Sequence, residues 1–177
     1  LRTRKNTPIT HFNTQQIREM LDKEIIEPSK RCQYASSFFA IPKADDVEMR
    51  PIFDYSHITP HLPTPKFVLP NIYQVVRRLN WPSNLYYIKL DIKQCFFNIP
   101  IHIKSRHVTT IKYDGKYYRF RVLPFGIGIA PFVAQAHCNA IVRKIRKTTK
   151  HVWGHIDDIL IAHKSKKVLK ILGQRIK

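Results

Sequence analysis

The chain has 177 residues, enough for one well-packed domain or for two small lobes that share a core. Its 31 Lys and Arg against 12 Asp and Glu give a formal net charge of +19, which indicates a polyanionic partner. Nucleic acid is favoured because 8 Tyr and 10 Phe can stack on bases. No apolar run approaches the roughly 20 residues that span a bilayer, so we expect no membrane insertion.

The cysteines and the N-terminus indicate a compartment. Cys32, Cys95 and Cys138 are odd in number and widely spaced, without a Cys-x-x-Cys pair. They predict reduced thiols, and neither a disulfide framework nor a zinc site. The basic N-terminal segment lacks the apolar centre of a secretion signal. We therefore expect an intracellular protein that is not secreted, located in the cytoplasm or within a viral or retroelement particle.

The first third of the chain predicts a helix followed by a hairpin. Residues 1–12 predict an extended basic segment, and Asn13 a helix start. The apolar face of this helix continues to Ile25, and Pro28 ends it. Residues 36–42 and 50–55 then predict two strands joined by a polar turn.

The middle of the chain predicts mixed structure. Residues 57–70 hold repeated prolines and predict an irregular crossing, because proline cannot donate to a strand ladder. A short helix is expected over residues 71–79, and a strand buried on both faces over residues 86–92. Residues 107–123 predict a hairpin that turns at Asp114–Gly115.

The last part predicts a helix from Pro131 to about Arg146, then a strand, tight turn and strand over residues 152–163. A basic helical tail follows. The order of these elements is that of an α+β protein with irregular connections.

Three carboxylates stand where charge is locally costly. Asp91 interrupts the apolar strand YYIKLDI, and Asp157 and Asp158 separate two apolar runs. Burying an uncompensated anion costs several kcal/mol, and a shared divalent cation would offset that cost. Acids at a strand end and at a hairpin turn suit a two-metal phosphoryl-transfer site. An Asp-Asp pair taken alone is also an ordinary hairpin turn.

Four segments in order resemble reverse transcriptases. They are FFAIPKADDVEMRPIFDY (38–55), IKLDIKQCFFNIPI (88–101), RVLPFGIGIAPFVAQ (121–135) and HIDDILIAH (155–163). The first is similar to the fingers hairpin of the family, and the others to three successive polymerase motifs. The resemblance extends from about residue 8 to the last residue, and retroviral, retrotransposon and hepadnaviral enzymes share it.

The resemblance implies roles for the charged residues. Asp91 and Asp157 match the principal catalytic metal-binding acids, and Asp158 matches the third acid. Lys43 and Arg50 match the pair that clamps the incoming deoxynucleoside triphosphate (dNTP), which suits their phosphate-binding chemistry. On a chain this basic, both cations could also be ordinary solvated charges.

The resemblance also implies four further contacts. Phe96 matches the aromatic ring that excludes a ribose 2′-hydroxyl, although a core aromatic is the alternative. Gly126 permits close backbone approach to the nucleotide, or is a turn glycine, and the two are compatible. Gln135 matches a polar dNTP-binding residue on the template-facing helix. His155 stands where relatives carry an aromatic residue beside the primer end.

The fold implied is the fingers and palm of a right-hand polymerase, with an antiparallel palm sheet backed by helices. We expect fingers over residues 1–66 and 99–129, and palm over residues 67–98 and 130–177. Two Mg²⁺ ions, which Mn²⁺ could replace, are the implied cofactors. The implied partners are an RNA or DNA template-primer and dNTPs. The family's primer grip, thumb and ribonuclease H have no counterpart in these residues, so a longer Pol protein is expected.

Two other functions fit part of the sequence. A truncated, inactive or domesticated copy would act only as a basic RNA-binding protein. A metal-dependent nuclease would explain the acids, but neither the PFG segment (124–126) nor the Lys43 and Arg50 pair.

Overall fold

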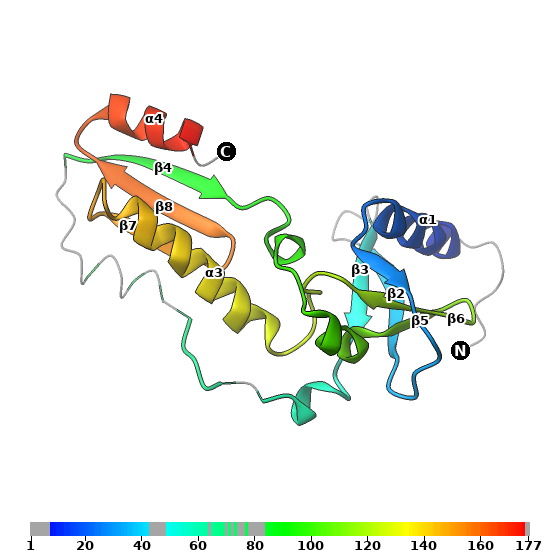
Figure 1. Ribbon diagram of the computed structural model, residues 1–177. Helices are drawn as coiled ribbons and strands as arrows, with labels where there is room; N and C mark the ends of the chain where they lie inside the picture. Colours follow the sequence, from blue (N-terminus) through cyan, green and yellow to red (C-terminus); the bar gives the residue numbers. More distant parts are fainter. Residues whose placement is uncertain are drawn as a thin grey trace. The chain divides into compact units, whose positions relative to one another are not determined.

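The computed structural model describes residues 8–42, 49–63, 65–69, 71, 73, 77 and 84–175 (Figure 1). The chain forms two compact units, each made of two segments. The first unit comprises Leu1–Thr64 and Phe96–Ala130, and the second Pro65–Cys95 and Pro131–Lys177. The names fingers and palm for these units remain predictions. Among the described residues, no helix has the length and apolar character needed to cross a membrane.

The first unit is built on a mixed five-stranded sheet in the order β1-β6-β5-β2-β3. Its strands are β1 (Ile26–Pro28), β2 (Ser36–Pro42), β3 (Met49–Asp54), β5 (Ile111–Tyr113) and β6 (Lys116–Phe120). Neighbouring strands are antiparallel except β2 and β5, which run parallel. Helix α1 (Pro8–Asp22) and the short 3₁₀ helices η1 (Thr59–His61), η2 (Cys95–Asn98) and η3 (Ile103–Thr109) complete the fold of this region.

An aromatic core holds this sheet together. Along β2, Phe38 and Ala40 are buried, whereas Phe39 between them is exposed, the period-two pattern of a sheet with one covered face. The Phe38 ring stacks on the Phe53 ring of β3 at 5.2 Å, and Phe53 meets Phe120 of β6 edge-on at 5.0 Å. The contact between Phe53 and Phe120 joins strands that are far apart in sequence.

The structure corrects the predicted first helix. Helix α1 begins at Pro8, five residues before the predicted Asn13, because proline is favoured in the first turn of a helix. It ends at Asp22, and Glu24, with a φ of 54°, reverses the chain into β1. Pro28 therefore belongs to a strand. The predicted Asp114–Gly115 turn is confirmed, with φ of 47° and 74° as a type I′ hairpin requires.

Glu27 fastens the short strand β1 to its surroundings. Its Oε1 accepts from Arg119 Nε at 2.6 Å, and its Oε2 accepts from Arg106 Nη1 at 3.2 Å. Arg121 Nε lies 4.0 Å from the same Oε2. Burial acts to raise the pKa of Glu27, but the hydrogen bonds and charges of Arg119 and Arg106 outweigh it and hold that pKa below its ordinary 4.5.

Glu27→Gln should destabilise the protein by about 1–3 kcal/mol at pH 7, because three guanidinium groups lose their shared carboxylate. A carboxyl group whose pKa is lower in the folded than in the unfolded protein stabilises the fold at pH values above its unfolded pKa. That stabilisation is lost as the pH falls through the folded pKa. The difference in urea midpoint between wild type and variant should therefore shrink below about pH 4.5.

Glu19→Gln is the matched control, because Glu19 makes a 3.8 Å pair with Lys23 on an exposed helix surface. That substitution should change stability by less than about 0.5 kcal/mol. A Glu27→Gln difference that stays constant from pH 7 to pH 3 would contradict the stabilising role of the carboxylate.

The second unit contains an antiparallel sheet in the order β4-β8-β7. Its strands are β4 (Tyr86–Asp91), β7 (Val152–His155) and β8 (Asp158–His163), and its helices are α3 (Ala130–Ile145) and α4 (Lys166–Arg175). The predicted strand-turn-strand, the helix near Pro131 and the helical tail are confirmed. Both helices pack on the sheet through a single core (Figure 1), formed by Cys138, Val142, Ile145, Val152, Ile159, Ile161, Leu169 and Leu172.

Strand β4 differs from its prediction. Ile88 and Leu90 pack against the helix-covered core, but Tyr86 and Tyr87 are each 52% exposed. The prediction of a strand buried on both faces is wrong, because the face that carries Tyr87, Lys89 and Asp91 is exposed. Most of the helix predicted over residues 71–79 lies outside the described residues.

Candidate active site

The candidate catalytic acids lie at one end of the three-stranded sheet. Asp91 is the last residue of β4 and Asp158 the first of β8, and the two are direct cross-strand partners. His155 ends β7 and pairs with Asp158 from the other side. Directly opposed residues in a sheet project their side chains from the same face. Asp91, Asp158 and His155 therefore form one row across the three strands, and Asp157 lies in the adjoining turn.

The turn between β7 and β8 consists of Ile156 and Asp157. Ile156 has a φ of 56°, a left-handed conformation that is unfavourable for a β-branched residue. Hydrogen bonds from other segments hold it there. The Asp157 carbonyl accepts from the Ile92 N–H at 2.7 Å, and the Cys95 thiol reaches the Ile156 carbonyl at 3.7 Å. The turn is thus tied to the residue that follows Asp91.

The side chain of Gln135 on α3 supports the same turn. Its side chain is buried, with 5% exposure, and its Oε1 accepts from the Ile156 N–H at 2.9 Å. Its Nε2 donates to the Gly154 carbonyl at 3.1 Å and to Asn139 Oδ1 at 2.9 Å. Both ends of the amide are therefore engaged within the protein. Its contact with a nucleotide stays a prediction, and its role in the hairpin was not anticipated.

Gly154 allows α3 to pack closely against β7. A Cβ atom at this position would collide with the side chains of Cys138 and Val142 on the helix. The absence of a side chain therefore brings the helix and the hairpin close enough for Gln135 to reach the turn.

The acids are less buried than their sequence context predicts. Asp91 is exposed, and Asp157 and Asp158 are half-buried. The expectation that burial makes these charges costly is wrong, because the sheet ends at the acids and leaves them accessible to solvent. Within the described part of the chain, no three His, Cys, Asp or Glu side chains are grouped as a ready metal site.

A lysine lies among the acids. Lys89 Nζ is 3.0 Å from Asp158 Oδ2. The hydrogen bond and charge of Asp158, and then the charges of Asp91 and Asp157, raise the pKa of Lys89. Lys89 was not among the predicted site residues, although a residue two positions before Asp91 in a strand must share its face.

The thiol of Cys95 responds to the same acids. Burial is the largest cause that raises the pKa of Cys95, and the negative charges of Asp157 and Asp91 add to it. A thiol in this environment stays protonated and is a weak nucleophile, which agrees with a structural role beneath the turn.

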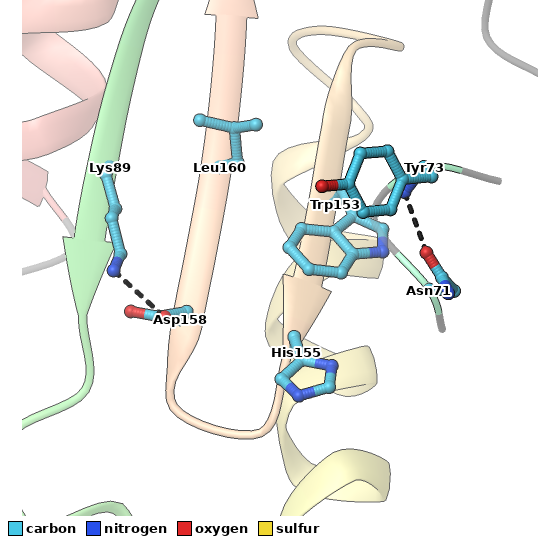
Figure 2. Close-up of a pocket in the computed structure, with 7 residues that line it drawn as sticks. All are labelled: Asn71, Tyr73, Lys89, Trp153, His155, Asp158 and Leu160. Carbon is cyan, nitrogen blue, oxygen red and sulfur yellow. Dashed lines mark hydrogen bonds and ion pairs between the residues drawn. The ribbon is translucent and has the colours of Figure 1, made fainter. Parts of the chain in front are cut away.

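A pocket of about 490 Å³ opens on the sheet face that carries the acids (Figure 2). Its lining residues are Asn71, Tyr73, Lys89, Trp153, His155, Asp158 and Leu160. The His155 ring stacks on Trp153, with centroids 5.6 Å apart and planes 23° apart. Trp153 Nε1 and His155 Nδ1 are buried and have no hydrogen-bond partner among the described residues. Contact of His155 with a primer stays a prediction.

The remaining predicted site residues belong to the first unit. Arg50 is exposed on β3, and Lys43 lies outside the described residues. Phe96 is half-buried in η2. Gly126 has a φ of 91°, and a Cβ there would lie 2.5 Å from the Phe53 carbonyl oxygen, so the backbone itself requires glycine. Nucleotide contacts by these residues stay predictions.

Residues 41–177 match the family model described as "Reverse transcriptase (RNA-dependent DNA polymerase)". The chain belongs to this family. The match includes Asp91, Asp157 and Asp158 in one continuous stretch. The predicted resemblance is therefore confirmed.

Two curated relatives illustrate the range of similar proteins. The retrovirus-related Pol polyprotein from transposon 412 of Drosophila melanogaster is 29% identical over 169 residues, which cover 90% of this chain and 13% of the polyprotein. Protein P of heron hepatitis B virus is 29% identical over 114 residues, 63% of this chain and 14% of that protein. The chain thus spans a small part of the curated relatives that it matches.

Solved reverse transcriptases share the fold. The foamy viral protease-reverse transcriptase in complex with an RNA/DNA hybrid superposes with a TM-score of 0.78 at 20% identity, covering 98% of this chain and 22% of that one. The complex of the foamy viral enzyme with double-stranded DNA gives a TM-score of 0.75 at 20% identity, covering 99% of this chain and 30% of that one. The mixed sheets and helices described above are therefore those of a reverse transcriptase fold.

Reverse transcriptases generally use divalent metal ions, and the acids here suit such ions in their chemistry. Carboxylate oxygens are hard ligands of the kind that Mg²⁺ prefers. Asp91 and Asp158 are adjacent in register, and Asp157 directly precedes Asp158. Together these residues supply three carboxylates, of which Asp158 is paired with Lys89. The donor set fits a divalent cation.

Proposed function

We propose that this domain is the core of an RNA-directed DNA polymerase that adds dNTPs to a primer 3′-hydroxyl on an RNA or DNA template. The observation that carries this proposal is the placement of Asp91 beside Asp158, with Asp157 in the turn that adjoins them. Family membership and the +19 charge of the chain support it, since a template-primer is a polyanion.

In this proposal Asp91, Asp157 and Asp158 hold two Mg²⁺ ions, or Mn²⁺ in their place. When bound, these ions supply a lowered pKa for the primer hydroxyl and charge stabilisation for the leaving pyrophosphate. The protein fold positions the three acids. The β4-β8 register sets Asp91 beside Asp158, and the hydrogen bonds from Gln135 and Ile92 fix the turn that carries Asp157.

The residues predicted to bind the incoming nucleotide have these proposed roles. Lys43 and Arg50 would bind its triphosphate, and Phe96 would exclude a ribose 2′-hydroxyl. Gly126 and Gln135 would complete the nucleotide site. In the second unit, His155, stacked on Trp153, would support the primer end.

Further domains and an intracellular location are also proposed. A complete Pol protein would add a thumb and a ribonuclease H domain to this core. The three free cysteines fit a reducing intracellular location, in the cytoplasm or within a particle.

The test is primer extension on an RNA template with four dNTPs and Mg²⁺. We expect template-dependent incorporation that is lost in Asp157→Ala. Extension by that variant at the wild-type rate would overturn the assignment of the acids. Salt-sensitive template binding without any extension would instead favour the alternative of a basic RNA-binding protein.

A further inference from the structure

Lys89 and the three acids share one small surface. Lys89 lies two residues before Asp91 in β4, so both side chains project from the same face of the sheet. Its ammonium reaches across to β8 and contacts Asp158 Oδ2 at 3.0 Å. Figure 2 shows this pair beside the pocket, with Asp158 turned toward the lysine. The Asp158 carboxylate is therefore already paired with the Lys89 ammonium of the protein itself.

The contact is accessible and easily exchanged. The Lys89 side chain is 66% exposed and that of Asp158 is 35% exposed. Exposed ion pairs of this kind contribute little to stability, so a divalent cation can displace the ammonium. A displaced ammonium would stay on a flexible side chain near the acids and continue to repel a second positive charge.

We propose that Lys89 competes with a divalent cation for Asp158 and thereby sets the metal affinity of the site. This inference rests on the proposed function, since it assumes that Asp91, Asp157 and Asp158 hold the metal. Lys89 would keep the acids partly neutralised in the free protein and weaken metal binding there. It would make metal loading depend on an incoming triphosphate, whose negative charge offsets that of the ammonium.

The experiment is a titration of the protein with Mn²⁺ in the absence of nucleotide, followed by the electron paramagnetic resonance signal of free Mn²⁺. Lys89→Met removes the charge and keeps the length of the side chain. We expect it to lower the Mn²⁺ dissociation constant by about threefold to tenfold at low salt. Lys89→Arg keeps the charge and should stay within about twofold of wild type.

Lys144→Met is the matched control, because Lys144 is an exposed lysine near the end of α3 in the same unit. It removes the same charge and should leave the Mn²⁺ affinity unchanged. An unchanged or weakened affinity in Lys89→Met, in a variant that melts like wild type, would overturn the inference about Lys89.

Asp91→Asn separates this failure from a failure of the proposed metal site. If Asp91→Asn weakens Mn²⁺ binding but Lys89→Met has no effect, the metal site stands and the competition by Lys89 is refuted. If Asp91→Asn leaves Mn²⁺ binding unaltered, the metal lies elsewhere and both proposals fall.

Discussion

Asp91→Asn should reduce nucleotide incorporation by about a thousandfold or more, because a neutral amide removes one of the charges proposed to hold the metal ions. Template binding should change little, since it depends on the basic residues of the chain. Asp91 is exposed at the end of an edge strand, so the substitution should not disturb the fold. Single-turnover primer extension and template titration, performed on the same preparation, measure the two effects separately.

Asp114→Asn is the control for the loss of one negative charge. Asp114 occupies a type I′ hairpin turn, where asparagine is equally favoured, and it belongs to the first unit. The Asp114→Asn variant should incorporate nucleotides at the wild-type rate. A comparable loss of activity in both variants would mean that net charge, and not a metal site at Asp91, governs the reaction.

Gln135→Leu should destabilise the second unit by about 2–4 kcal/mol, because it removes the partners of two backbone groups in a buried environment. The Ile156 N–H would lose its acceptor, and the Gly154 carbonyl would lose its donor. Leucine resembles glutamine in volume, so loss of packing contributes little. The left-handed conformation of Ile156 would lose one of its supports, and Asp157 would shift with it. Urea unfolding monitored by tryptophan fluorescence measures the stability, since both Trp81 and Trp153 belong to the second unit.

Asn139→Ala separates the hairpin contacts of Gln135 from its contact within α3. It removes the acceptor of one Gln135 hydrogen bond but leaves both contacts to the hairpin in place. It should cost less than about 1 kcal/mol and leave incorporation nearly unchanged. If Gln135→Leu is as stable as wild type, the amide does not hold the turn.

Much of the site could be predicted because its signals are local. The apolar runs on either side of Asp157 and Asp158 indicate two strands with a tight turn between them, although the turn itself consists of Ile156 and Asp157. The residue pair Asp114–Gly115 is by itself typical of a hairpin turn. The roles predicted for Asp91 and Arg50 come from the motif resemblance, because no local pattern indicates them.

The features that were predicted wrongly or missed depend on contacts between distant segments of the chain. The Lys89–Asp158 pair follows from the β4-β8 register, which joins residues far apart in the chain. The role of Gln135 depends on how closely α3 packs at Gly154. The apolar character of β4 suggested burial on both faces, but the core packs only against Ile88 and Leu90, and Tyr86 and Tyr87 are exposed.

The division of each unit into two chain segments has a consequence for synthesis on the ribosome. Strand β4 is made before β5, β6, α3 and β7, yet its partner β8 follows all of them. An unpaired strand with exposed tyrosines is prone to pair with other chains while it waits. The second unit cannot close its core until Leu172 of α4 has emerged. A nascent chain is therefore most vulnerable to aggregation during translation of the interval between β4 and β8.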